Sequence, residues 1–300
     1  MHTNQTLKSY RGRFAPSPSG ELHFGSLLAA MASYADARAH QGQWLLRIDD
    51  IDQVRVVPDS EQHIINSLEQ AGFEWDEPVY YQSQHIADYQ QALGNLTAGG
   101  LIYPCYCSRK QIKALARDNI YPGICRETAI PDESADEYAL RIRVPEQNLS
   151  FNDLIQGHYC QQLDKEVGDF IIFRRDKVFT YQLAIVVDEY LAGISHVIRG
   201  HDLISSTPRQ MFLQQQLGFA TPRYGHIPLA VTPDNLKLSK LSHAKKVTTD
   251  LTTLVLAARI LGQAVLKAED YQHQQDFWKH LFQIWQLKQV PKMEKIEIMY

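Results

Sequence analysis

The stretch Arg13-Phe-Ala-Pro-Ser-Pro-Ser-Gly-Glu-Leu-His-Phe-Gly-Ser26 decides the fold of this chain. Residues 10–14 predict a short strand that ends before Pro16, and a helix is predicted to open near His23. A turn of small residues between a strand and a helix start aims free backbone N–H groups and the positive end of the helix dipole at one place. We therefore predict a phosphate-binding junction, with a spacing that is neither the dinucleotide fingerprint nor a P-loop.

Two residues of this junction carry the chemical prediction. His23 and Gly25 are expected in the first turn of the helix, where a small residue lets a ligand approach and an imidazole can donate to it. An isolated H-x-G-x pattern is more often a surface turn before an ordinary amphipathic helix. The functional interpretation therefore rests on the length of the whole stretch and on a second motif downstream.

The overall composition places few limits on function. Three hundred residues, 44% of them hydrophobic, can form two domains or one elaborated domain. The net charge of −4 gives no general attraction to nucleic acid, so an RNA contact has to use local basic patches. No apolar run reaches the ~18 residues that span a bilayer, and the first residues lack the apolar core of a signal peptide. These features predict a soluble, cytoplasmic protein without a membrane partner.

Hydrophobic spacing predicts the organisation of the chain. Residues 8–104 alternate strands and helices as in a parallel sheet with helices on its faces, and residues 101–103 are predicted to be its next strand. Residues 105–178, with short strands and a proline- and acid-rich loop, indicate an insertion. Strands and helices resume over 179–240, and residues 241–300 are predicted to be helical.

Two further element predictions are specific. Thr207 is predicted to be the N-cap of a helix that ends at Gly218, with Pro208 in its first position and Gln210 completing a capping box. Residues 227–231 predict a last strand, which is followed by Lys237-Leu238-Ser239-Lys240.

Both motifs resemble the signatures of a known family. His23-Phe24-Gly25-Ser26 resembles the "HIGH" signature of class I aminoacyl-tRNA synthetases, and the preceding stretch from Arg13 has the form used by the glutamyl and glutaminyl branch. Lys237-Leu238-Ser239-Lys240 resembles the second signature, "KMSKS". The resemblance covers residues 8 to about 245. It implies an α/β, Rossmann-like catalytic domain in two halves (8–104 and 179–240), an inserted zinc-containing subdomain (105–178) and a short helical C-terminal region (241–300).

The second motif suits the departure of pyrophosphate from ATP. A mobile loop with two lysines can close on the triphosphate and stabilise the charge that develops there. In-line attack of a carboxylate on the α-phosphate requires positioning and charge stabilisation rather than a general base. The resemblance implies that His23, Lys237 and Lys240 are catalytic. It further implies that ATP, with Mg²⁺, is held by His23, Gly25 and Lys240.

The resemblance also implies a pocket for glutamate. Its residues are Arg13, Ala15, Ser17, Asp49, Tyr181 and Arg199. Two guanidinium groups suit the two carboxylates of a dicarboxylic amino acid, and one acidic group suits its ammonium. The family usually has Glu where this chain has Asp49, and the neighbouring Asp50 and Asp52 leave open that these are plain carboxylates at a strand end.

Cysteine spacing indicates a metal site. Cys105, Cys107 and Cys125 fall within 21 residues, which suggests tetrahedral zinc with a fourth ligand still to be found, against the alternative of free structural cysteines. The resemblance proposes Tyr121 as that ligand, whereas chemistry alone leaves His158 or a water open. The remaining cysteine, Cys160, is predicted to pack in the core.

Basic residues surround this cluster. They are Arg109, Lys110, Lys113, Arg117 and Arg126, five in 18 positions. They form either a patch for an RNA backbone, held in shape by a structural zinc, or a solvated helix face.

The short region after Lys240 narrows the functional hypothesis. Its 60 residues are too few for a full anticodon-reading domain, so the chain most resembles the truncated glutamyl-Q tRNA(Asp) synthetases. That resemblance implies activation of glutamate by ATP without tRNA, and transfer of the glutamyl group to the cyclopentenediol of queuosine at the wobble position of tRNA(Asp). Two alternatives are a compact glutamyl-tRNA synthetase that charges the 3′ end of tRNA(Glu), and an inactive synthetase-like RNA-binding module. The presence of His23, Gly25, Lys237 and Lys240 argues against the inactive module.

Overall fold

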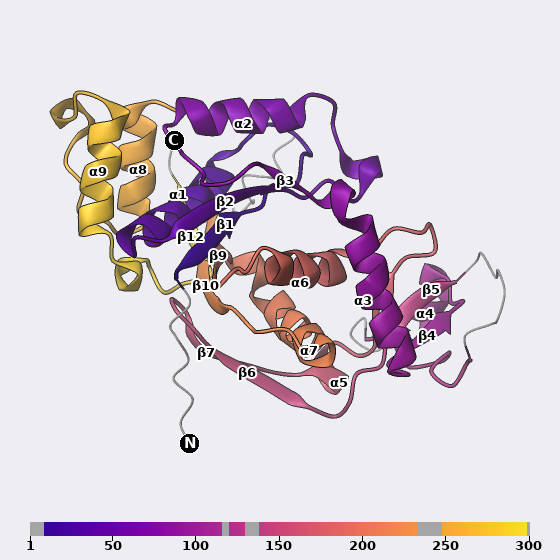
Figure 1. Cartoon of the computed structure of the whole chain (residues 1–300). Coiled ribbons are helices and arrows are strands. Elements are labelled where there is room, and N and C mark those ends of the chain that lie inside the picture. Colours follow the sequence, from indigo (N-terminus) through magenta and orange to yellow (C-terminus); the bar gives the residue numbers. More distant parts are fainter. Residues whose placement is uncertain (1–8, 116–119, 130–137, 233–247, 299–300) are drawn as a thin grey trace, which may run out of the picture.

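A parallel sheet forms the centre of the molecule. The computed structural model describes residues 9–115, 120–129, 138–232 and 248–298. Strands β1 (Arg11–Phe14), β2 (Gln43–Ile48) and β3 (Tyr80–Tyr81) pair in parallel, as do β9 (His196–Gly200) and β10 (Arg223–Ile227). The Ser195 amide donates to the Arg11 carbonyl at 2.9 Å, so that β9 lies beside β1 (Figure 1). The α/β fold and the strands expected at residues 10–14 and 196–198 are confirmed.

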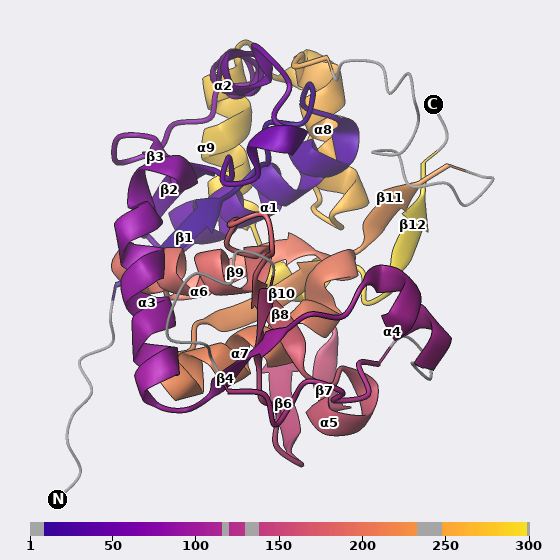
Figure 2. The same cartoon turned by 90° about the vertical axis from the view of Figure 1, so that its right-hand side faces the viewer.

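Helices cover both faces of this sheet (Figure 2). Helix α1 (Phe24–Ala39) lies between the sheet and the C-terminal helices α8 (Leu251–Ile260) and α9 (Gln274–Ile284). The side chains of β2 alternate between the faces: Trp44 and Leu46 pack in the core with α1, while Leu45 packs on the other side with Val197. Because α1 is covered on both sides, it is apolar around most of its circumference.

A second core lies beneath the sheet. It contains α3 (Ile86–Ala98), α6 (Tyr181–Leu191) and α7 (Thr207–Leu217). The same core includes an antiparallel sheet in the order β4 (Ile102–Cys105), β5 (Ala139–Ile142) and β8 (Phe170–Phe173). Helix α2 (Ser60–Gln70) packs instead in the core that α1 forms with Trp44 and Leu46.

Strand β4 corrects one prediction. Residues 101–103 were expected in the parallel sheet, but β4 pairs antiparallel with β5 and belongs to a separate sheet. A short apolar run predicts a strand without its partner, and the partner here lies more than 30 residues further along the chain.

The segment after β5 is mostly antiparallel. Strands β6 (Asn148–Asp153) and β7 (Gly157–Gln162) form a hairpin that leads into α5 (Leu163–Glu166).

The remaining helices are short. Helix α4 (Arg109–Leu115) follows β4. Short 3₁₀ helices are η1 (Gln53–Arg55), η2 (Gln82–His85), η3 (His201–Ser206), η5 (Ala268–Asp270) and η6 (Leu287–Gln289).

The predicted last strand is divided in two. Strand β10 ends at Ile227, and β11 (Leu229–Val231) pairs instead with β12 (Lys295–Glu297) near the end of the chain. Pro228, between them, has no N–H to donate to a ladder, which explains why the pairing changes there.

The start of α7 also differs from its prediction. The 3₁₀ helix η3 runs directly into α7, so Ser206 precedes the helix and Thr207 lies inside it without capping it. The Thr207 hydroxyl accepts a hydrogen bond from Arg199 instead, at 2.8 Å. Pro208 is therefore the second helical residue instead of the first, and no side chain caps the helix, so the predicted capping box with Gln210 is wrong. The end of the helix at Gly218, in the left-handed conformation with φ 71°, is confirmed.

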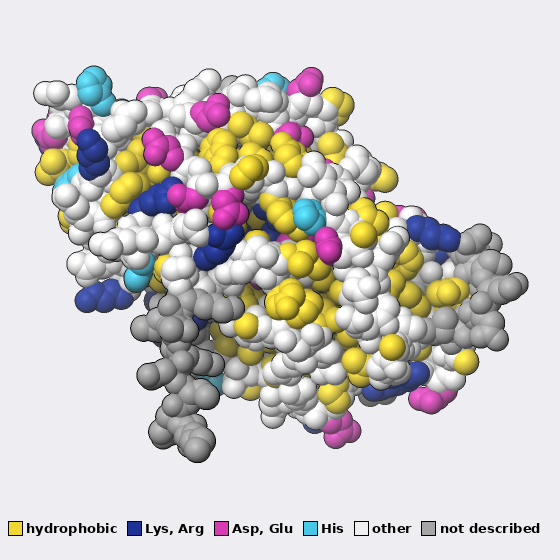
Figure 3. All heavy atoms as spheres, in the orientation of Figure 1, with side chains coloured by type: hydrophobic (Ala, Val, Ile, Leu, Met, Phe, Trp, Pro, Cys, Tyr) yellow, Lys and Arg dark blue, Asp and Glu magenta, His cyan; other side chains and the backbone are white. Residues whose placement is uncertain are grey.

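The surface shows no large field of one charge on the face drawn in Figure 3. Lys and Arg side chains lie among Asp and Glu there, in keeping with a net charge of −4. Within the described parts of the chain, every helix is too short or too polar to cross a membrane.

One buried carboxylate joins the C-terminal helices to the sheet layer. Asp36, 1% exposed on α1, accepts hydrogen bonds from the Tyr10 hydroxyl at 2.6 Å and from Trp285 Nε1 at 2.9 Å. Trp285 directly follows α9, so this contact fixes how α9 docks against α1.

We expect Asp36→Ala to lower the free energy of unfolding by about 2 kcal/mol or more, because two buried donors would lose their acceptor. Asp36→Asn keeps one acceptor oxygen and should lose less, and Glu69→Ala, on the exposed face of α2, should change little. Urea unfolding measures all three. Equal stability of Asp36→Ala and Glu69→Ala would contradict this role of Asp36.

Candidate active site

The strand–turn–helix junction is fixed by backbone contacts. The Pro16 carbonyl accepts from the Asp49 amide, and the Pro18 carbonyl accepts from the Val57 amide and the Ser60 hydroxyl, at 2.6–2.9 Å. These bonds tie the loop after β1 to the end of β2 and the start of α2. The turn is therefore held against the segment that carries Asp49.

His23 caps the helix that the turn opens. It is the N-cap of α1, and its Nδ1 accepts from the Ser26 amide at 3.1 Å, so His23 precedes the first turn, contrary to the prediction. Gly25 does lie in the first turn. A Cβ at Gly25 would come within 3.3 Å of the His23 ring, so the absent side chain leaves room for the imidazole over the helix start.

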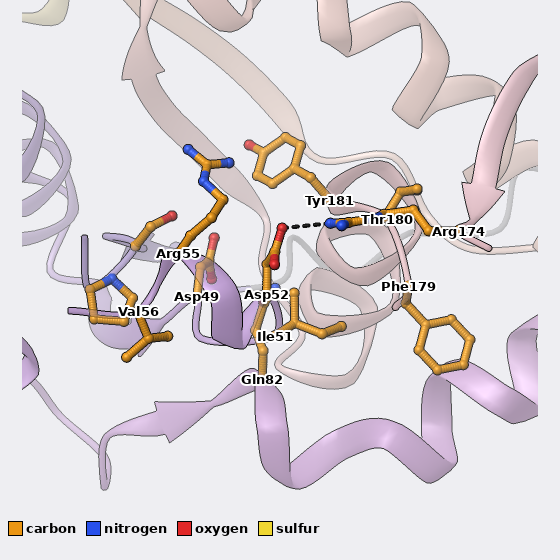
Figure 4. Close-up of a pocket in the computed structure, with 12 residues that line it drawn as sticks. Asp49, Ile51, Asp52, Arg55, Val56, Gln82, Arg174, Phe179, Thr180 and Tyr181 are labelled. Atoms are coloured by element: carbon orange, nitrogen blue, oxygen red, sulfur yellow. Dashed lines mark hydrogen bonds and ion pairs between the residues drawn. The ribbon is translucent and has the colours of Figure 1, made fainter. Parts of the chain in front are cut away.

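A cavity of about 200 Å³ opens beside this junction (Figure 4). Its lining combines the loop after β1, the end of β2 and the start of α6. Three residues predicted for the glutamate pocket line it: Ser17, Asp49 and Tyr181. Ala15 lies on the same loop, between β1 and Ser17.

Asp49 is buried with a cationic partner. Its carboxylate accepts from Arg47 Nε at 2.7 Å, and its side chain is 5% exposed. Burial raises the pKa of Asp49 to about 6, although the guanidinium of Arg47 opposes that shift. Near neutral pH the group is therefore an ionised carboxylate beside the cavity, able to accept from an ammonium.

The two predicted arginines are also buried. Arg13 donates through Nε and Nη2 to Glu189 at 2.9–3.1 Å, and both side chains are at most 5% exposed. Arg199 Nη1 is buried and has no hydrogen-bond partner among the described residues. Burial raises the pKa of Tyr181, which Arg199 and Arg13 oppose and Asp49 and Glu189 reinforce. Arg13, Asp49 and Arg199 therefore lie near enough to Tyr181 to act on its charge, so that these four residues form one cluster. Of the predicted pocket residues, Arg13, Ala15 and Arg199 do not line the cavity itself.

Sequence analysis missed several members of this cluster. Asp188 and Glu189 lie inside α6, and Asp188 accepts from Tyr80, Tyr89 and Gln82 at 2.6–2.9 Å. Arg47 lies 3.7 Å from Asp188 and 2.7 Å from Asp49. The sequence did contain a signal for them, because charged residues are rare inside apolar elements. Two acids occur in an apolar helix, and an arginine occurs in an apolar strand.

A second ion pair crosses the cavity. Arg174 Nη1 donates to Asp52 at 2.6 Å, and the two side chains point toward one another in Figure 4. Asp50 instead accepts from the backbone and hydroxyl of Ser83. Of the three acids in residues 49–52, Asp49 alone is paired with Arg47, while Asp50 and Asp52 hold loops through Ser83 and Arg174.

Some predicted residues lie elsewhere. Lys237 and Lys240, with the whole Lys-Leu-Ser-Lys motif, fall outside the described residues, as does Arg117. His23 and Gly25 do not line the described cavity and sit at the start of α1.

The predicted metal ligands converge. The sulfur atoms of Cys105, Cys107 and Cys125 all lie within 4.8 Å of one another, and none forms a disulfide. The Tyr121 hydroxyl lies 3.5 Å from Cys105 Sγ and 3.6 Å from Cys107 Sγ. Three sulfurs and one oxygen at these spacings could hold a tetrahedral metal ion. His158 is exposed on β7 and lies outside this cluster.

Arg141 packs against this cluster. Its Nε donates to Cys105 Sγ at 3.2 Å, and its guanidinium lies 3.8 Å above the Tyr121 ring. Burial raises the pKa of Cys107 to about 11. Burial also opposes ionisation of Cys105, but hydrogen bonds with Tyr121 and Arg141 outweigh it and lower the Cys105 pKa.

Two predictions about residues near the cysteine cluster are corrected by the structure. Cys160 is exposed on β7 rather than packed in the core, because its side chain falls on the outer face of the β6–β7 hairpin. Arg126 donates to the Val144 carbonyl at 2.9 Å and lies 3.6 Å from Asp169, so it anchors the Cys125 loop. The exposed basic residues of α4 are Arg109, Lys110 and Lys113.

Comparisons with known proteins show the family of this chain. Residues 9–254 match the family model of the class I tRNA synthetases (E and Q), catalytic domain. A glutamyl-Q tRNA(Asp) synthetase of Ectopseudomonas mendocina is 49% identical over 85% of this chain and 86% of its own length. Another, of Pseudomonas fluorescens, is 48% identical over 87% of both chains.

Solved structures share the fold. A glutamate-tRNA synthetase of Elizabethkingia anophelis superposes with a TM-score of 0.79 at 22% identity, covering 96% of this chain and 68% of that one. The match to the family model and the identity to these relatives show the same membership: the chain belongs to the class I tRNA synthetases of the glutamyl and glutaminyl type, in the group of the glutamyl-Q tRNA(Asp) synthetases.

Proposed function

We propose that this chain is an ATP-dependent ligase that activates glutamate and transfers it to the queuosine of tRNA(Asp). The observation that carries the proposal is the buried cluster of Arg13, Asp49, Tyr181 and Arg199 beside the strand–turn–helix junction. Nearly half of the aligned residues are identical to relatives named for this reaction, which supports the choice of acceptor.

The first step joins glutamate to the α-phosphate of ATP. A carboxylate oxygen of glutamate attacks the α-phosphorus in line, the bond to the bridging oxygen breaks, and pyrophosphate leaves. Arg13 and Arg199 would hold the carboxylates of glutamate, and Asp49 its ammonium. The start of α1, with His23 and Gly25, would meet the phosphates, and Lys237 and Lys240 would stabilise the departing pyrophosphate with Mg²⁺.

The second step transfers the glutamyl group. A hydroxyl of the queuosine cyclopentenediol attacks the activated carbonyl carbon, and an ester bond forms. AMP leaves with the electron pair of the broken acyl–phosphate bond, and the proton of the hydroxyl passes to its phosphate or to water. The exposed basic residues of α4, Arg109, Lys110 and Lys113, would contact the RNA backbone.

Four segments share this work in the proposal. Residues 8–104 and 179–240 would form the two halves of the catalytic domain, 105–178 an inserted subdomain, and 241–300 a mainly helical cap that also contains β12. Strand β4 falls mostly in the first range but pairs with β5 of the insertion. The docking of α8 and α9 on α1 supports the cap, and the antiparallel pairing of β5 with β8 supports the insertion.

A zinc ion would brace the inserted subdomain. Cys105, Cys107, Cys125 and Tyr121 would hold it, and the ion would supply a structural cross-link rather than a reaction step. The link joins the end of β4 to the loop of Tyr121 and Cys125, and α4 lies between these two points. The basic residues of α4 would thereby be held in one orientation toward RNA.

Mapping of labelled product tests the function directly. The protein is incubated with ATP, labelled glutamate, and tRNA from cells that contain or lack queuosine. We expect label in the anticodon loop of queuosine-containing tRNA(Asp) only, and none with Lys240→Ala. Label at the 3′ end of tRNA(Glu), independent of queuosine, would identify a compact glutamyl-tRNA synthetase instead. Binding of tRNA without any labelling would favour the inactive module.

The pKa of Asp49 predicts how glutamate binding depends on pH. Only the ionised carboxylate attracts an ammonium, and Asp49 gains its proton as the pH falls through about 6. The KM for glutamate should therefore rise about tenfold between pH 7 and pH 5. Pyrophosphate exchange at saturating Mg-ATP measures it. Asp49→Asn should have a high KM without this pH dependence, and a wild-type KM that stays constant down to pH 5 would contradict the assignment.

Removal of single ligands tests the zinc site. The wild-type protein should retain one zinc ion per chain after dialysis against a mild chelator, and Cys107→Ser should retain almost none. Tyr121→Phe should bind zinc more weakly if the phenol is the fourth ligand, and should match the wild type if a water is. Cys160→Ser is the matched control, because Cys160 is exposed and outside the cluster. Atomic emission measures the zinc content of each protein. One zinc ion per chain in Cys107→Ser would rule out this site.

A further inference from the structure

A buried acid–histidine pair lies behind Arg199. Asp153 ends β6 and His226 lies on β10, and both side chains are fully buried. Asp153 Oδ2 and His226 Nδ1 are 2.5 Å apart, and Arg199 Nε lies 3.0 Å from His226 Nε2. The three side chains form a chain from the β6–β7 hairpin, through the end of β10, to β9.

The hydrogen positions follow from the partners. The Asp153 carboxylate accepts from the amides of Ile155, Gln156 and His226, so it faces donors on every side and is itself an acceptor. His226 Nδ1 must then carry the hydrogen that it shares with Asp153. Its Nε2 is left with a lone pair, which accepts the Nε–H of Arg199.

A neutral imidazole is required for this arrangement. Arg199 has only N–H donors, so a second hydrogen on His226 Nε2 would face one of them. Burial lowers the pKa of His226 to about 4; Asp153 opposes this shift, and Arg199 and His201 reinforce it. The ring is therefore neutral wherever the enzyme would work.

The other contacts of Arg199 leave one of its three nitrogen atoms without a hydrogen-bond partner among the described residues. Its Nη2 donates to the Thr207 hydroxyl at 2.8 Å and to the Leu203 carbonyl at 3.3 Å. The guanidinium also lies over the Tyr224 ring. Nη1 is buried and lacks a partner among the described residues, which costs free energy unless a ligand meets it.

We propose that His226 and Asp153 are positioning residues, which hold the Arg199 guanidinium so that Nη1 meets a carboxylate of the bound amino acid. This inference rests on the proposed function, in which Arg199 belongs to the glutamate pocket. It makes the β6–β7 hairpin part of substrate recognition, although Asp153 itself touches no substrate. A purely structural pair would join the hairpin to the sheet without affecting which ligand binds.

Substitutions at His226 separate the two roles. In His226→Gln, the amide oxygen can accept from Arg199 while the amide nitrogen donates to Asp153, so the chain of hydrogen bonds can be kept. His226→Leu removes both contacts. In pyrophosphate exchange, we expect His226→Leu to raise the KM for glutamate about tenfold or more with little change in the KM for ATP, and His226→Gln to stay within about threefold of the wild type.

Asp153→Asn tests the hydrogen positions. An asparagine amide can donate to His226 Nδ1, which moves the ring hydrogen to Nε2, opposite the Arg199 donor. We expect the KM for glutamate to rise as in His226→Leu. If His226→Leu does not fold, the contrast between His226→Gln and Asp153→Asn decides, and an equal KM in those two variants overturns the inference.

Two controls distinguish the possible failures. Leu149→Ala removes a buried side chain from the same hairpin without contacting Arg199, so it should lower stability and leave the KM for glutamate unchanged. A rise in this KM equal to that of His226→Leu would show that the pair is only structural. Arg199→Ala must raise the KM for glutamate; if it does not, the proposed pocket fails. If it does while His226→Leu does not, only the positioning role is overturned.

Discussion

The ion pairs of the buried Arg47 guanidinium hold together the centre of this molecule. The guanidinium comes from β2 and lies between Asp49, at the end of the same strand, and Asp188, on α6. Asp188 in turn accepts from Tyr80, on β3, and Tyr89, on α3. Removal of one partner from such a buried pair leaves an uncompensated charge and costs about 3–5 kcal/mol. The sheet and two helices beneath it are therefore joined by one charge network.

This network also explains how a charged pocket can exist before a ligand arrives. Arg13, Arg47 and Arg199 bring three positive charges, and Asp49, Asp188 and Glu189 bring three negative ones. Asp153, behind His226 and Arg199, adds a fourth buried acid. Each arginine is held by a neighbour that belongs to the protein and not to the substrate. In the proposed function, a site held in this way would need little rearrangement when a dicarboxylic amino acid enters, which would favour precise positioning for attack on ATP.

The cysteine cluster brings together distant parts of the segment between β4 and β5. Cys105 ends β4, and Tyr121 and Cys125 lie on the loop beyond α4. Arg141 on β5 and Arg126 on that loop fasten the same region, through Cys105 and through the Val144 carbonyl. Such a small segment has little apolar core of its own, so cross-links of this kind would be expected to hold it in shape.

The sequence by itself determined the junction after β1, the α/β fold, most helices, three of the residues that line the cavity, and the set of converging cysteines. These follow from local patterns: spacing along one strand or helix, turn residues, and motifs within a few positions of each other. Only the tertiary structure decided that β4 turns antiparallel, that Thr207 accepts from Arg199, and that Glu189, Asp188 and His226 lie against the buried arginines. The physical reason is distance along the chain. Arg13 meets Glu189 across 176 positions and Asp153 meets His226 across 73, and no local pattern specifies which buried charges will face one another after folding.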